Sequence, residues 1–481
     1  MSTSEISVDS VRASTVREGS RVVVVGGGPG GYEAALVARQ LGAFVTLVER
    51  NGIGGSAVLT DVVPSKTLIA TADLMTMTES AEELGILTGA RSFPVDLQRV
   101  HERILKLAQR QSVDIRGRLE SEGVQIIDGA GRLGPADGGV RTVLVDETGG
   151  GTRELIAEIV LLSVGAHART LPEAVPDGER ILSWDQIYNL RELPEHLIVV
   201  GSGVTGAEFA GAYNVLGSQV TLVSSRDQVL PGEDAEAAQL IESVFTRRGM
   251  TILSSSRAQA AHRTDDGVAV TLTDGREVRG SHCLIAVGAI PNTTGIGLEE
   301  GGVALNPSGH IQVDRVSRTT AYRVYAAGDC TGVLPLASVA AMQGRIAMYH
   351  ALGDAVAPLD TRSVSANIFT SPEIATIGVT EKEILAGKVD GAVTRLPIAR
   401  NPRAKMLGIK EGFIKLFSDR ASGVILGGVV VAPNAGELIF PITLAVAHRL
   451  TVDQVAQVFT IYPSLTGSLT EAARQLHTER S

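Results

Sequence analysis

Residues 21–31 read RVVVVGGGPGG, four valines that run directly into a cluster of glycines. The residues that follow, YEAALVARQLG, read as a helix. The stretch therefore predicts a buried parallel strand, a tight turn and a helix, with Gly26, Gly28 and Gly31 at the positions of the G-x-G-x-x-G dinucleotide fingerprint. There the first glycine makes the turn, the second lets a pyrophosphate approach the backbone, and the third lets the helix pack on the strand. The N–H groups that begin the helix would face the phosphates.

The same pattern returns at residues 196–227, HLIVVGSGVTGAEFAGAYNVLGSQVTLVSSRD. Gly201, Gly203 and Gly206 occupy the fingerprint positions of this second copy, and a VTLV run follows at the same distance in both copies. Two units with intact glycines indicate two working dinucleotide sites. The alternative is an ancestral duplication in which one copy no longer binds.

The two copies differ where the second strand ends. The first copy has Glu49, a carboxylate that would accept hydrogen bonds from ribose hydroxyls and repel a 2′-phosphate. The second copy has Ser224, followed by Ser225 and Arg226. Hydroxyls beside an arginine suit the 2′-phosphate of NADPH. The alternative is that Arg226 is an ordinary surface charge, and use of both NADH and NADPH stays open.

The composition narrows the class of protein. A chain of 481 residues with 44% hydrophobic and 20% charged residues predicts about three globular domains. Its net charge of 43 − 53 = −10 gives no basic field for nucleic acid, and no apolar run approaches the roughly 20 residues of a membrane span. Residues 1–19 are polar, lack the apolar core of a signal peptide and are predicted to be a flexible tail. Cys283 and Cys330 have neither metal-site nor disulfide spacing, which favours a reducing cytoplasm.

Other segments complete the outline of the fold. Residues 324–327 are predicted to form a buried strand, which places Asp329 at the carboxyl edge of a sheet, where open α/β folds bind ligands. From Thr361 onward the fingerprint does not recur, and strands mix with helices such as residues 435–447. This last part is predicted to be an α+β interaction domain.

Both fingerprints, the segment GGSAVLTDVVPSK (residues 54–66), AAGDC (326–330) and YPSLTG (462–467) together resemble one family. It is the flavoprotein disulfide reductase family of glutathione reductase and dihydrolipoamide dehydrogenase, and the resemblance covers residues 20–475. It implies an α/β fold with two Rossmann-type domains, FAD on the first unit, NADPH or NADH on the second, and a homodimer built through the C-terminal domain. The implied domains are 20–165 with 291–360 for FAD, 166–290 for NAD(P), and 361–475 for dimerisation.

The resemblance also implies roles for individual residues. Lys66 would lie beside the flavin N5 and pair with Glu208, and Asp329 would bind the ribityl chain. Glu49 and the first glycine turn would hold the ADP half of FAD, with Gly129 and Ala130 at the adenine. The full set expected around the first cofactor is Gly26, Gly28, Pro29, Gly30, Gly31, Glu49, Arg50, Gly55, Ser56, Lys66, Gly129, Ala130, Ser163, Gly165, Asp329, Leu336 and Ala337. The set expected around the second is Gly201, Gly203, Val204, Gly206, Glu208, Ser224, Ser225, Arg226 and Gly288.

The chain departs from this family at its redox centre. The family segment GG-x-C-x-N-x-G-C-x-P has two cysteines, and Ala57 and Val62 stand at those positions. The family's C-terminal H-x-H-P-T-x-x-E, with its acid–base pair, is replaced by a run with Tyr462, Pro463 and Gly467. Since attack on a disulfide needs a thiolate, disulfide reduction is not expected.

The predicted function is therefore direct transfer of electrons from NAD(P)H through flavin to a flat acceptor such as a quinone. The resemblance is closest to the lipoamide-dehydrogenase-like NAD(P)H quinone reductases, and Lys66, Glu208 and Tyr462 are the expected catalytic residues. Tyr462 would orient the acceptor, unless it only packs. Two alternatives stay open: a soluble pyridine nucleotide transhydrogenase, and a catalytically silent FAD-binding subunit or regulator.

Overall fold

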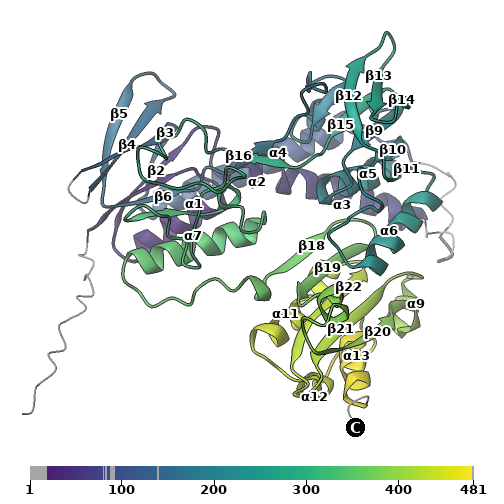
Figure 1. Ribbon diagram of the computed structural model, residues 1–481. Coiled ribbons are helices and arrows are strands. Elements are labelled where there is room, and N and C mark those ends of the chain that lie inside the picture. Colours follow the sequence, from purple (N-terminus) through teal and green to yellow (C-terminus); the bar gives the residue numbers. More distant parts are fainter. Residues whose placement is uncertain (1–18, 80, 82–83, 87–92, 138–139, 479–481) are drawn as a thin grey trace, which may run out of the picture. The chain divides into compact units, whose positions relative to one another are not determined.

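The computed structural model describes residues 19–79, 81, 84–86, 93–137 and 140–478 (Figure 1). The chain forms two compact units. Unit 1 comprises Met1–Val58, Arg110–Ala166 and Pro291–Leu359, and unit 2 comprises Leu59–Gln109, His167–Ile290 and Asp360–Ser481. The predicted tail, residues 1–19, lies outside the described residues except for Gly19. No helix in the described ranges combines the length and apolarity that crossing a bilayer requires.

Unit 1 is built on a seven-stranded sheet in the order β17-β6-β1-β2-β3-β4-β5. The strands from β17 to β3 pair in parallel, and β3, β4 and β5 form an antiparallel meander. The elements of this unit are β1 (Arg21–Val25), α1 (Pro29–Gln40), β2 (Phe44–Glu49), β3 (Gln125–Asp137), β4 (Val140–Glu147), β5 (Thr152–Ala157), β6 (Ile159–Leu162), β17 (Val324–Ala326), the 3-10 turn η2 (Asp329–Thr331) and α7 (Ala337–Ala351). Four elements lie on the boundaries between the units: α2 (Gly55–Leu59), α4 (Leu97–Ser121), β7 (Ala166–Ala168) and β16 (Ala289–Pro291).

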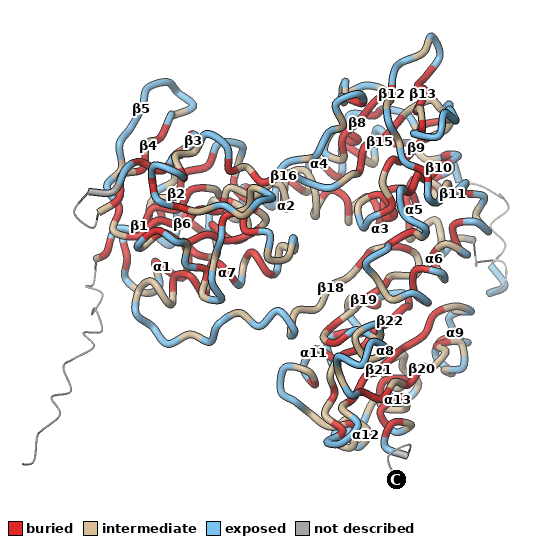
Figure 2. The backbone as a smooth tube through the Cα atoms, viewed as in Figure 1, coloured by how far each residue is buried: buried red, intermediate tan, exposed pale blue. Residues whose placement is uncertain are grey.

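The four valines of β1 explain why this strand is central. Val22 and Val24 are buried in the core on one face of the sheet, together with apolar residues of α1 and α7, while Val23 and Val25 are buried in the core on the other face. A strand of the continuous apolar type predicted from the sequence is therefore covered on both sides. Figure 2 shows the same distribution, with buried residues in red along the strands and the outer loop at β5 in pale blue.

Unit 2 contains the second parallel sheet, in the order β11-β10-β9-β15-β8, and the antiparallel sheet β12-β13-β14. Residues 59–109 belong to this unit, because Leu68, Ile69 and Ala72 are buried against Phe209 and its neighbours in one core. The elements are α3 (Val62–Glu79), β8 (Ile181–Ser183), η1 (Ile187–Asn189), β9 (His196–Val200), α5 (Val204–Leu216), β10 (Gln219–Val223), α6 (Ala235–Arg247), β11 (Thr251–Leu253), β12 (Ala258–Arg263), β13 (Val268–Leu272), β14 (Glu277–Gly280) and β15 (His282–Ile285).

The C-terminal part of unit 2 is an antiparallel sheet in the order β18-β19-β22-β21-β20, covered by helices. The helix predicted over residues 435–447 is divided into α10 and α11, since Pro441, in the first turn of α11, has no N–H to continue the first helix. The elements are η3 (Thr361–Ser363), β18 (Ser365–Ile368), β19 (Glu373–Gly378), α8 (Glu381–Leu385), β20 (Gly391–Pro397), η4 (Ile398–Arg400), α9 (Pro402–Met406), β21 (Phe413–Asp419), β22 (Ile425–Ala432), α10 (Ala435–Leu438), α11 (Phe440–Ala447), α12 (Val452–Ala456) and α13 (Gly467–Thr478).

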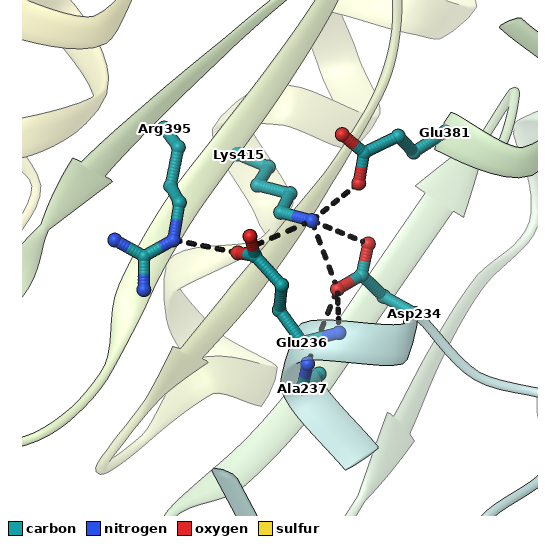
Figure 3. A network of polar contacts seen from close by, with 6 residues as sticks. All are labelled: Asp234, Glu236, Ala237, Glu381, Arg395 and Lys415. Atoms are coloured by element: carbon teal, nitrogen blue, oxygen red, sulfur yellow. Dashed lines mark hydrogen bonds and ion pairs between the residues drawn. The ribbon is translucent and has the colours of Figure 1, made fainter. Parts of the chain in front are cut away.

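A buried lysine joins the two parts of unit 2 (Figure 3). The ammonium of Lys415, on β21, donates hydrogen bonds to both oxygens of Asp234, at 3.1 and 2.9 Å, and to Glu381, and lies 3.4 Å from Glu236. Asp234 also caps α6, because it accepts two backbone N–H groups of that helix. Arg395 donates to Glu236 at 2.6 Å. The C-terminal sheet is thereby fixed to the start of α6.

The predicted α/β fold, with two Rossmann-type units and a C-terminal α+β domain, is confirmed. In each parallel sheet a central strand, β1 or β9, leads into a glycine turn and then a helix, α1 or α5. The domain boundaries expected at residues 165, 290 and 360 stay a prediction.

Candidate dinucleotide and flavin site

The first glycine turn has the geometry of a phosphate site. Gly26 has φ 103°, and a methyl group built on it would lie 2.2 Å from the carbonyl oxygen of Ser163. A methyl group on Gly31 would lie 1.8 Å from the carbonyl oxygen of Gly26, so both positions need glycine. At Gly28 no atom lies within 4 Å of such a methyl group, and this N-cap residue leaves the start of α1 without a side-chain cap. The open start of α1 could therefore hold a phosphate.

The second turn repeats this geometry in unit 2. Gly201 has φ 112° and a methyl group on it would lie 2.2 Å from the carbonyl oxygen of Ala286, while one on Gly206 would lie 1.8 Å from the carbonyl oxygen of Gly201. Gly203 caps α5 without a side-chain hydrogen bond and has open space where a methyl group would be. Each copy thus keeps crowded glycines at the first and third positions and an open one at the second. Both turns could accept a pyrophosphate.

Glu49 ends β2 beside the first turn and is buried. Its carboxylate accepts the backbone N–H of Gly27 at 2.6 Å and that of Asn51 at 2.6 Å. These two bonds fix the acid at the carboxyl end of the strand, where the fingerprint places a ribose. Arg50, the next residue, is exposed.

The corresponding residue of unit 2 has another environment. Ser224 is fully buried, and its Oγ lies 2.7 Å from Oγ of Ser202 and accepts the backbone N–H of Arg226 at 3.1 Å. The Ser224 hydroxyl is therefore occupied by hydrogen bonds within the protein, which stabilise the loop after β10. Ser225 and Arg226 are exposed at the end of β10. An expected contact to a 2′-phosphate rests on these two residues.

Lys66 and Glu208, which lie 142 positions apart in the sequence, are brought together by the packing of α3 on α5. Their charged atoms are 2.6 Å apart, and the exposed fractions of the two side chains are 25% and 4%. Glu208 uses its other oxygen to accept the backbone N–H of Phe369 at 2.9 Å, and the Lys66 ammonium lies 5.0 Å from the centre of the Phe369 ring. The Phe369 N–H therefore fixes the Glu208 carboxylate, while the Lys66 side chain remains partly exposed to a ligand.

Asp329 begins η2, three residues after the end of β17, at the carboxyl edge of the unit 1 sheet. Burial raises the pKa of Asp329, and the nearby charge of His310 opposes this shift. The turn before it is held by Gln343 of α7, a buried side chain that accepts the Gly328 N–H at 2.9 Å and donates to Thr331 at 3.3 Å. Sequence reasoning missed Gln343 and His310. The available signal was a polar side chain on the buried face of α7, beside Val339 and Ala340.

The other predicted cofactor residues lie in or near the loops and helix starts of the two Rossmann-type units. In unit 1, Gly30 packs against Ala327 and α7, while Leu336 is the N-cap of α7 and has no side-chain cap. In unit 2, Gly288 follows β15 with φ 97°. Pro29 and Val204 begin α1 and α5, Gly55 and Ser56 begin α2, Gly129 and Ala130 lie in β3, Ser163 and Gly165 follow β6, and Ala337 begins α7.

No cysteine stands in the segment that runs into α3. Ala57 lies within α2, and Val62 begins α3. The chain has only Cys283 and Cys330, which are free thiols and completely buried. Burial raises the pKa of each thiol to about 12. Neither sulfur is therefore available as a thiolate at neutral pH.

Tyr462 belongs to an exposed apolar segment in the C-terminal part of unit 2. Its exposed fraction is 82%, and its sequence neighbours Val458, Phe459 and Ile461 are also exposed. Exposed apolar side chains that are close together mark a surface for another molecule. The described residues include no group of three or more metal-ligating side chains that could hold a metal ion.

Comparisons with known proteins agree with this geometry. The chain is 52% identical over 462 residues to an NAD(P)H dehydrogenase (quinone) of Mycobacterium tuberculosis, covering 95% of this chain and 94% of that protein. It is 33% identical over 456 residues to a dihydrolipoyl dehydrogenase of Zymomonas mobilis, covering 94% and 96%.

A crystal structure of LpdA from Mycobacterium tuberculosis has a TM-score of 0.91 at 52% identity, covering 95% of this chain and 99% of that one. The family model described as pyridine nucleotide-disulphide oxidoreductase matches residues 20–344, and that of the family's dimerisation domain matches residues 364–473. The resemblance inferred from the motifs is confirmed. The chain belongs to the pyridine nucleotide-disulphide oxidoreductase family and carries its dimerisation domain.

Proposed function

We propose that this protein is a flavin-dependent NAD(P)H:quinone oxidoreductase that works without a redox-active disulfide. One observation carries the proposal: both glycine turns and the Lys66–Glu208 pair are intact, whereas Ala57 and Val62 provide no thiol. The 52% identical relative named NAD(P)H dehydrogenase (quinone) supports it.

FAD fits the residues of unit 1. The uncapped start of α1 at Gly28 suits the pyrophosphate, the fixed carboxylate of Glu49 suits the ribose, and Asp329 suits the ribityl chain. FAD, when bound, supplies a carrier of two electrons between a nicotinamide and a quinone. The open turn at Gly203 and the exposed Arg226 suit NADPH, and NADH stays a second donor.

Lys66 provides a fixed positive charge. Glu208 and its bond to the Phe369 N–H hold the ammonium in one place, so the charge needs no rearrangement during the reaction. We assign Lys66 a place beside the bound flavin, where its positive charge would stabilise negative charge on the flavin. Glu208 acts through Lys66.

The acceptor is assigned to the region of Tyr462. In a homodimer built through the dimerisation domain, the apolar segment around Tyr462 would be covered, and its phenol would donate a hydrogen bond to a quinone oxygen. A phenol without a neighbouring acid is a poor proton shuttle at neutral pH, so the proton comes from solvent. The two free thiols are consistent with a reducing cytoplasm as the site of action.

The test is an acceptor panel on flavin-loaded protein, with NADPH and NADH as donors. We expect one FAD per chain, steady reduction of a benzoquinone, and no turnover with lipoamide or oxidised glutathione. Transfer from NADPH to NAD⁺ at comparable efficiency would favour a transhydrogenase instead. Absence of turnover with every acceptor, on protein that holds FAD, would favour a silent subunit.

Stopped-flow measurement tests the part assigned to Tyr462. Tyr462→Phe should leave reduction by NADPH unchanged and slow the quinone half-reaction about tenfold, the effect of one lost hydrogen bond. Tyr349→Phe, which removes a phenol oxygen from α7, is the matched control. Equal quinone rates in wild type and Tyr462→Phe would remove Tyr462 from the acceptor site.

A further inference from the structure

Unit 1 has a pocket of about 650 Å³ at the amino end of β17 and the last turn of α7. Its lining includes Asp314, Arg318, Tyr322, Arg323, Tyr325 and His350. The cofactor residues Gly328 and Asp329 follow the opposite, carboxyl end of β17. A volume of this size accommodates a small organic ligand. The pocket is thus separate from the dinucleotide edge.

The charge of the pocket is opposite to that of the whole chain. Two arginines, Arg318 and Arg323, and one carboxylate, Asp314, give 2 − 1 = +1 in a protein of net charge −10. Asp314 accepts the backbone N–H groups of Val316 and Arg318 with one oxygen, and Nε of Arg318 with the other, at 2.7 Å. The side-chain bond uses only Nε, which leaves the outer edge of that guanidinium for another partner. A planar guanidinium matches a carboxylate or phosphate in geometry.

The side chains of Tyr322 and Arg323 lie against each other in the lining of the pocket. The Arg323 guanidinium carbon lies 5.6 Å from the centre of the Tyr322 ring, and its Nε donates to the phenol oxygen at 3.2 Å. The Tyr322 side chain is 66% exposed, so its ring is open to a planar ligand. The backbone of Tyr322 is fixed by the buried guanidinium of Arg141, which donates to the Tyr322 carbonyl oxygen at 3.2 Å.

The backbone of Arg323 is strained. Its φ is 57°, in the left-handed region, where glycine or asparagine would cost less. Ser317, adjacent to the lining residue Arg318, also has a positive φ of 64°. Strain of this kind gathers at ligand sites, where a particular side chain must be presented.

The inner wall is polar but uncharged. Oη of Tyr325 lies 2.9 Å from Nδ1 of His350. Burial raises the pKa of Tyr325 to about 12, and burial and the charge of Arg318 lower the pKa of His350. The phenol and a neutral imidazole therefore face the pocket at neutral pH, and they give polar contacts without adding negative charge.

We propose that this pocket binds a small aromatic anion, whose ring stacks on Tyr322 and whose phosphate or carboxylate is held by Arg318 and Arg323. The ligand binds independently of the nicotinamide and flavin cofactors.

Phenyl phosphate is a suitable probe, because it combines one ring with one phosphate. We would titrate it by calorimetry into FAD-loaded protein saturated with NADP⁺, so that both dinucleotide sites are filled. One binding event per chain is expected, with a higher affinity than for inorganic phosphate. No binding at millimolar phenyl phosphate overturns the proposal.

Three variants locate the site. Arg323→Asn should weaken phenyl phosphate at least about tenfold without lowering the melting temperature, since asparagine tolerates the left-handed conformation. Tyr322→Leu should reduce the affinity to that of inorganic phosphate. Arg315→Gln removes a nearby charge outside the lining and should change nothing. Unchanged binding in Arg323→Asn, or an equal loss in Arg315→Gln, overturns the assignment.

Discussion

Alanine at the second glycine of each turn should weaken the binding of one dinucleotide and leave the fold intact. Gly203 has φ −72° and ψ −173°, a conformation that alanine adopts without strain, and no atom lies within 4 Å of the added methyl group. The methyl group would occupy the space through which a pyrophosphate approaches α5. Loss of one or two charge-assisted hydrogen bonds, worth about 1.5–3 kcal/mol each, should weaken NADP⁺ binding at least about tenfold.

The third glycine provides the matched control. At Gly206 the added carbon would lie 1.8 Å from the carbonyl oxygen of Gly201, whereas real contacts are not closer than 3.0 Å. The helix or the strand must then shift by 3.0 − 1.8 = 1.2 Å, so Gly206→Ala should lower the melting temperature. Gly203→Ala should not lower it. The same contrast is expected in unit 1 between Gly28→Ala and Gly31→Ala.

The assay measures FAD per chain, NADP⁺ affinity and melting temperature on all four variants. Gly203→Ala should hold FAD and lose NADP⁺ affinity, and Gly28→Ala should show the reverse. If Gly203→Ala bound NADP⁺ as tightly as wild type, the second turn would not be the nicotinamide dinucleotide site. If it lost FAD as well, the two units would not bind separately.

Three further outcomes are expected. Arg226→Leu should raise KM for NADPH more than about tenfold and leave KM for NADH unchanged in steady-state kinetics, because only the former carries a 2′-phosphate. Lys415→Met should destabilise the protein by about 3–5 kcal/mol in denaturant melts, since it leaves the buried carboxylate of Asp234 without its cation, whereas Arg420→Met, which breaks an exposed ion pair, should cost less than about 1 kcal/mol. Burial, with the charge of Glu373, raises the pKa of Asp73 from 3.8 to about 6, so this group destabilises the fold as pH rises through 6. Asp73→Asn should therefore stabilise by roughly 1–2 kcal/mol at pH 8, after allowance for partial solvent exposure, and should lose that gain near pH 4 in melts at both values.

Local patterns predicted the two Rossmann units well, because a strand, a turn and a helix are set by neighbours in sequence. The valines of β1 and the crowded Gly26 and Gly31 are such cases. The environment of Ser224 could not be predicted, since its hydroxyl is bound by Ser202, 22 positions away. Gln343 was missed for the same reason, because its partner Gly328 is met only when α7 packs on the sheet.

The grouping of residues 59–109 with unit 2 also depends on distant contacts. Leu68 and Ile69 have ordinary helical spacing, which does not show which core they join. Only their packing against residues such as Phe209 decides it. The pairing of Lys66 with Glu208 was reached through the family motifs, and hydrophobic spacing alone would not have found it.

The complete burial of Cys283 and Cys330 affects how this protein would respond to oxidants. Peroxide, hypochlorous acid and heavy-metal ions inactivate thiol enzymes by attacking a thiolate or an accessible sulfur. Both sulfurs here are completely buried, and their high pKa keeps them protonated. On the proposed mechanism, which uses no thiol, electron transfer would continue when the thiol pools of the cell are oxidised. Nicotinamide reducing power would then still reach quinones at the moment when disulfide-dependent relatives have stopped.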